Sequence, residues 1–170
     1  MIRRVAFKKA ALAGALGACA WEAAVRALGV AGVPVLDLVR VLGTMAVGDV
    51  PWWQWWPVGM AHHLLVGVIW AVFYAYFFWS FFDLRPALQG MIFSLLPAVL
   101  AGLIMIPQMD LMRAGTPGGR LPSYGAFAVR LGFWGPASIV LGHLIYGAVM
   151  GSLYTRPVGY PVGRRAARYG

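Results

Sequence analysis

Charge is scarce in this sequence, and acidic charge above all. Only 11% of the 170 residues are charged, whereas a soluble domain usually devotes about a quarter of its residues to charge. There are 5 acidic residues against 14 basic ones, and 61% of the chain is hydrophobic. This composition excludes an ordinary soluble domain and predicts one integral membrane domain over residues 1–170.

Cysteine and catalytic motifs are equally scarce. The one cysteine, Cys19, lies in an apolar run, so neither an intrachain disulfide nor a cysteine metal cage can form. The chain contains no nucleophile elbow, no HExxH motif and no phosphate-binding loop. We therefore expect a protein that is not an enzyme.

Four apolar runs are long enough for transmembrane helices, each of which needs about 20 residues. The predicted spans cover residues 10–33, 57–82, 86–106 and 136–155. Pro57, Pro86 and Pro136 should fall in first helical turns, where a missing N–H is harmless. Pro97 should kink the third span. The predicted fold class is an all-α membrane protein with four transmembrane helices.

Two sequence motifs occur twice, in the same order. HLLVGVIWAVFY at 63–74 matches HLIYGAVMGSLY at 143–154, and PVLDLVR at 34–40 matches PQMDLMR at 107–113. The chain therefore reads as repeat one (10–82) and repeat two (86–155), each with two spans. Because a unit with two crossings ends on the side where it began, the two repeats should be parallel.

Basic residues indicate the orientation. Nine of them lie in the two tails and beside the third span, including the basic tail 156–170, and four lie in the other loops. The positive-inside rule then places both termini in the cytoplasm. This distribution explains the formal net charge of +9 by topology and anionic lipid, so we expect a lipid bilayer and no nucleic acid as partner. The tryptophans of the outward loop, WWQWW at 52–56, should form an interfacial belt.

Each histidine-bearing segment has a face of small residues. His63, Gly67 and Ala71 follow one another at helical spacing, as do His143, Gly147 and Gly151. Small residues four apart let helices approach closely in lipid, so these faces are predicted to pack against other helices.

Ionisable residues inside the spans are the candidate functional groups. Glu22, His63 and His143 should share one polar layer, roughly 10–12 Å from the outer boundary of the hydrocarbon. A buried ionisable group in a span is a functional candidate. Alternatively, Glu22 forms only an i,i+4 ion pair with Arg26, and each histidine bonds only a neighbour.

Two further pairs are expected at the interface. Asp37 with Arg40, and Asp110 with Arg113, have the i,i+3 spacing of helical ion pairs.

These features leave three functions open. The first is an accessory or interaction subunit of a larger membrane complex, in contact with other membrane subunits or with copies of itself. The second is a b-type cytochrome in which His63 and His143 clamp one haem, with the glycines clearing room for the macrocycle. The third is a small transporter of protons or ions that uses Glu22 and both histidines.

Three stretches carry a family resemblance: ACAWEAAVRALG, ALQGMIFSLL and GHLIYGAVMG. They resemble the YagU-like family of small bacterial inner-membrane proteins, which also begin with an apolar helix carrying a Trp-Glu pair and end with a Gly-His span. The resemblance implies a multi-pass protein of the bacterial inner membrane, and it implies no particular chemistry.

Overall fold

The computed structural model describes residues 5–79, 84–114 and 122–154, and within these residues all regular structure is helical. In chain order the elements are α1 (Phe7–Val30), α2 (Leu38–Val47), α3 (Trp52–Phe77), α4 (Pro86–Leu100), the π-helical segment η1 (Ala101–Met105), α5 (Ile106–Ala114), the 3-10 segment η2 (Ala126–Leu131) and α6 (Trp134–Leu153). Four helices are long and apolar enough to cross a membrane, which confirms the predicted all-α fold with four spans. The predicted basic tail lies outside the described residues.

The third span is longer than predicted. Instead of ending at residue 106, it continues from Pro86 to Met112 through α4, η1 and α5. Pro97 lies inside it, and the π-helical turn begins four residues later. Because proline cannot donate a backbone hydrogen bond, the helix adjusts its pattern locally and continues.

The second span begins earlier than predicted. Pro51 precedes its first residue, and the tryptophan run forms its first turns, so this run is helical and not part of a loop. Pro57 consequently lies in the helix interior, beyond the first turn. Trp52 and Trp53 are more than half exposed, as a role in an interfacial belt would require, although the belt itself stays a prediction.

The short helix α2 was not predicted. Its ten residues are too few to cross a bilayer, which takes about 20. It packs instead along the start of α3, and two glycines allow the contact. A Cβ on Gly43 would overlap the carbonyl of Trp55, and one on Gly59 would overlap the carbonyl of Val39.

The packing faces predicted around the duplicated glycines are used within the chain. Gly67 and Ala71 of α3 face Gly14 of α1, and Gly147 and Gly151 of α6 face Gly90 of α4. In each half, the histidine-bearing helix thus packs against the preceding span. The duplication itself stays a prediction.

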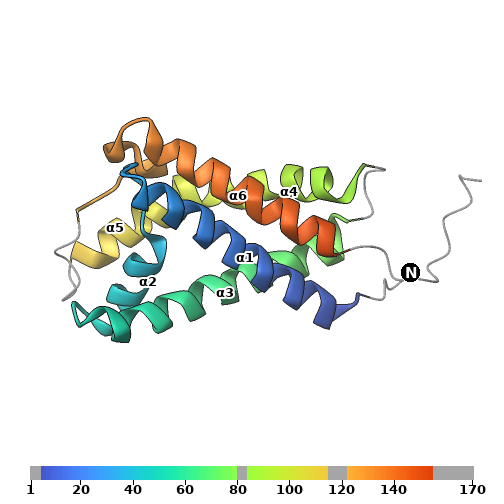
Figure 1. The fold of residues 1–170 in the computed structure, drawn as a ribbon, viewed down its shortest axis with the longest axis horizontal. Helices are drawn as coiled ribbons and strands as arrows, with labels where there is room; N and C mark the ends of the chain where they lie inside the picture. The colour runs from blue at the N-terminus through green and yellow to red at the C-terminus, as the bar shows by residue number, and fades with distance from the viewer. Residues whose placement is uncertain (1–4, 80–83, 115–121, 155–170) are drawn as a thin grey trace, which may run out of the picture.

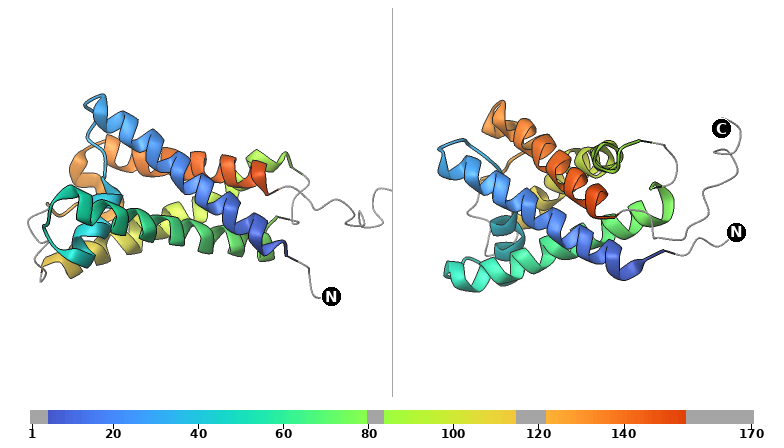
Figure 2. Two further views of the ribbon diagram at one scale, coloured as in Figure 1. Left: turned by 60° about the horizontal axis from the view of Figure 1, so that its bottom comes forward. Right: turned by 45° about the vertical axis from the view of Figure 1, so that its right-hand side comes forward.

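The cross-contacts between the two halves are unequal. α1 packs extensively against both α6 and α3 (Figure 2). The backbones of α3 and α4 lie farther apart, and aromatic side chains bridge them: the ring of Phe93 on α4 lies 5.2 Å from that of Tyr74 and 6.2 Å from that of Trp70 on α3. Because the backbones are most widely separated here, we call the side between α3 and α4 the open side of the bundle.

The first and last described helices share one end of the bundle. α1 begins and α6 ends at one end of the bundle, and α2 and α5 lie at the opposite end (Figure 1). Four spans require this arrangement. Which end faces the cytoplasm stays a prediction.

Candidate intramembrane binding site

A cavity of about 350 Å³ lies at the open side of the bundle. Its wall is formed by α1, α3, α6 and the continuous helix α4–η1–α5, together with Leu36 and Leu38 at the start of α2. Most of the lining side chains are aliphatic or aromatic. Both duplicated histidines, His63 and His143, belong to this lining. The structure therefore brings together the two histidines, which lie eighty residues apart in the sequence.

Trp21 of α1 lies against both histidines. The centroid of its ring is 4.7 Å from that of His63 and 6.4 Å from that of His143, which it meets nearly edge-on. Its Nε1 is buried without a hydrogen-bond partner and packs against Gly142, where any Cβ would overlap it. Trp21 thus joins the two histidine helices through packing.

His63 is almost completely buried on α3. Its exposed fraction is 9%, and the backbone carbonyl of Ala18 lies near its ring, but Nε2 makes no hydrogen bond. An unpartnered ring nitrogen at this depth is costly, since lipid offers no substitute for water.

His143 makes a hydrogen bond within its own helix. Its Nδ1 lies 2.8 Å from the carbonyl oxygen of Ile139, one turn earlier on α6. A carbonyl oxygen only accepts, so Nδ1 carries the proton of this bond. Three residues further on, the buried Tyr146 donates its hydroxyl to the carbonyl of Gly67 at 2.6 Å and so ties α6 to α3.

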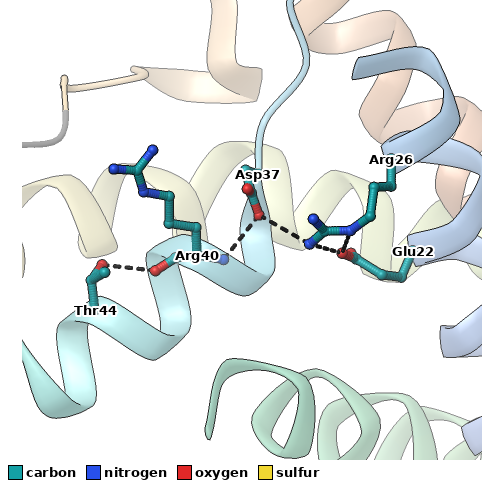
Figure 3. A network of polar contacts seen from close by, with 5 residues as sticks. All are labelled: Glu22, Arg26, Asp37, Arg40 and Thr44. Carbon is teal, nitrogen blue, oxygen red and sulfur yellow. Dashed lines mark hydrogen bonds and ion pairs between the residues drawn. The ribbon is translucent and has the colours of Figure 1, made fainter. Parts of the chain in front are cut away.

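Glu22 belongs to a polar cluster that includes neither histidine. Arg26 donates to its Oε1 from Nε at 2.9 Å and from Nη2 at 2.6 Å (Figure 3). The same Nη2 lies 3.8 Å from Oδ1 of Asp37. This cluster lines a second pocket of about 380 Å³ at the end of α1. The two histidines thus share one cavity and Glu22 lines another, while a common depth of the three residues in the membrane stays a prediction.

The two repeated aspartates make different contacts. Asp37 caps α2, because its Oδ1 accepts from the backbone N–H of Arg40 at 2.9 Å, while the Arg40 guanidinium points away (Figure 3). Asp110 instead accepts through Oδ2 from the backbone N–H groups of Tyr124 and Gly125, at 2.8 and 2.7 Å. In both places the aspartate meets backbone amides. The side chain of Arg113 lies outside the described part of the chain.

A haem between the histidines does not fit this arrangement. The hypothesis needs free space beside Gly67 and Gly147. A Cβ on Gly67 would already lie 2.9 Å from the Cβ of Ala18, and one on Gly147 would lie 2.5 Å from Oγ of Ser94. Both positions are filled by neighbouring helices. Among the described residues, no three His, Cys, Asp or Glu side chains form a group that could hold a metal ion.

The fold and site define an integral membrane protein with four spans and a mostly apolar cavity between them. Comparisons with protein-family models, curated proteins and solved structures find no match to this chain. Membership of the YagU-like family, a bacterial inner membrane and cytoplasmic termini therefore stay predictions.

Two residues of the site were missed by sequence reasoning. Trp21 was noted only as the neighbour of Glu22, and Tyr146 was not singled out. A usable signal existed for Tyr146, which lies three residues after His143 on the same helical face. Trp21 offered no such signal, because its contact with both histidines depends on how three helices cross.

Proposed function

We propose that this protein binds a lipid-soluble small molecule in the cavity between α3 and α4, without acting on it chemically. The observation that carries the proposal is the cavity itself. Its volume of about 350 Å³ lies within the range of small-molecule sites, roughly 300–1,000 Å³. Its wall combines extensive apolar surface with a few polar side chains, as such sites do.

Entry from the bilayer supports a lipid-soluble ligand. Ile104 lines the cavity and is also 57% exposed, so the cavity reaches the outer surface of the bundle. The surface there is apolar, since Leu103 beside it is equally exposed. A molecule dissolved in the bilayer can therefore enter sideways, without crossing water.

The packing faces offer less support for a role that depends on partner subunits. The small residues predicted to pack against other helices, Gly67, Ala71, Gly147 and Gly151, contact helices of the same chain and so are not available to a partner. An accessory subunit remains compatible with ligand binding, and it would use other surfaces. Transport through a shared polar layer is less favoured, because Glu22 pairs with Arg26 outside the cavity.

Photolabelling tests this proposal. The purified protein in mild detergent is irradiated with a dodecyl chain that carries a diazirine, and the labelled residues are mapped by mass spectrometry. We expect labelling of cavity residues on α3 and η1 that saturates with probe concentration. Val66→Phe narrows the cavity from α3 and should reduce this labelling several-fold.

The matched control is Leu65→Phe. Leu65 neighbours Val66 on α3 but is 56% exposed and does not line the cavity. Labelling of the cavity in this variant should equal that of the unmodified protein. The proposal is wrong if labelling rises linearly with probe and is confined to the lipid-facing surface, or if both variants behave alike.

A further inference from the structure

The polar atoms of the cavity differ in what they can offer to a ligand. Two nitrogens next to it, Nε1 of Trp21 and Nε2 of His63, are covered by protein atoms. Gln108 is exposed at the rim. This leaves the α6 side of the cavity, where His143 and Tyr146 lie three residues apart on one helical face.

The hydrogen bonds that these two side chains already make determine which further hydrogen bonds they can form with a ligand. His143 uses its Nδ1 proton on the carbonyl of Ile139, so an uncharged ring has only a lone pair at Nε2. No carboxylate lines the cavity among the described residues, and an uncharged ring is therefore favoured there. Tyr146 uses its proton on the carbonyl of Gly67, so its oxygen can only accept a further bond.

We infer that the ligand is a neutral lipid-soluble alcohol, a long-chain or isoprenoid molecule that donates its hydroxyl proton to His143. This inference rests on the proposed function. Among these two residues of α6, His143 has an acceptor nitrogen to offer, and neither has a proton left to donate. An ester, ether or ketone of equal size brings only acceptors, and would meet the lone pair of His143 without a proton between them. A hydroxyl can donate its one proton to Nε2 of His143.

Competition against the diazirine probe tests the ligand class. Unlabelled dodecanol and dodecyl methyl ether are compared at equal mole fractions in the micelle, which removes differences in partitioning. The two molecules differ in one respect that matters here, because the ether cannot donate a proton. We expect dodecanol to displace the probe at a concentration about fivefold to tenfold lower, the effect of one buried hydrogen bond.

The variant His143→Phe keeps an aromatic ring of similar shape and removes the acceptor. It should lose the preference for the alcohol over the ether. His62→Phe is the matched control, since His62 is exposed on α3 and does not line the cavity. The preference should persist in this control.

The possible results separate the two proposals. Saturable labelling with equal competition by alcohol and ether overturns the ligand class and leaves ligand binding intact. A preference that survives His143→Phe also overturns the assignment of the hydroxyl to His143. Absence of any saturable labelling overturns both proposals together.

Discussion

The close contact between α4 and α6 makes a stability prediction that can be worked through in detail. Gly90 of α4 faces the carbonyl of Gly147, and an added Cβ would overlap this backbone carbonyl. Gly151 lies beside the same point. A backbone group on a helix cannot rotate away as a side chain can. Gly90→Ala must therefore move the two helices apart.

The size of the effect follows from the separation. An alanine needs an ordinary van der Waals distance, so the helices must separate by about an ångström near this point. Such a gap forfeits a quarter to a half of the dispersion energy of the atom pairs that face one another, and overpacking typically costs about 1–3 kcal/mol. The better helix propensity of alanine returns about 0.8 kcal/mol. We expect a net loss of up to about 2 kcal/mol in the free energy of unfolding.

Titration with SDS in dodecyl maltoside micelles, followed by circular dichroism, measures this free energy. The matched control is Gly29→Ala in α1, where the new Cβ would approach only one side-chain methyl, Cγ2 of Val35, at 3.3 Å. The control should change stability by less than about 1 kcal/mol, because that methyl can shift. Equal stability of Gly90→Ala and Gly29→Ala would refute the reasoning, since it would mean that α4 and α6 tolerate separation without loss.

Two further substitutions test individual hydrogen bonds. Tyr146→Phe removes the bond to the Gly67 carbonyl and should reduce the free energy of unfolding by about 1 kcal/mol in the same SDS titration, as membrane-buried bonds do; a loss several times larger would show that the hydroxyl does more than join α6 to α3. Asp110→Ala removes the acceptor of two loop amides, so the amides of Tyr124 and Gly125 should exchange hydrogen with solvent about tenfold faster. Unchanged exchange at both amides would contradict the anchoring role of Asp110.

The repeated aspartates show what a sequence motif can and cannot predict. The motif P-x-[LM]-D-L-x-R is the same in both halves, so sequence reasoning assigned both aspartates to ion pairs with the following arginine. In the structure, Asp37 lies after a break and caps a new helix, whereas Asp110 lies within a continuing one. The local sequence supplies the acceptor. Whether a helix ends before it depends on the surrounding helices.

The four spans were determined by the sequence alone. A run of about 20 apolar residues must hydrogen-bond its own backbone in lipid, so it forms a helix whatever its neighbours are. The packing faces follow for the same reason, because residues four apart share a face of any α-helix. Both are local properties of the sequence. The packing faces, for example, could be predicted from the spacing of His63 and Gly67 and from the same spacing at His143 and Gly147.

The cavity was decided by the tertiary structure. Its existence depends on α1 packing closely against α6 while the backbones of α3 and α4 lie farther apart, a difference that the similar motifs of the two halves do not predict. The position of Trp21 between the histidines, and the hydrogen bond from Tyr146 to Gly67, arise only when these helices cross. Helix formation is local, but the choice among similar apolar faces is made by side-chain shape at each crossing, and it was this choice that placed both histidines around one space.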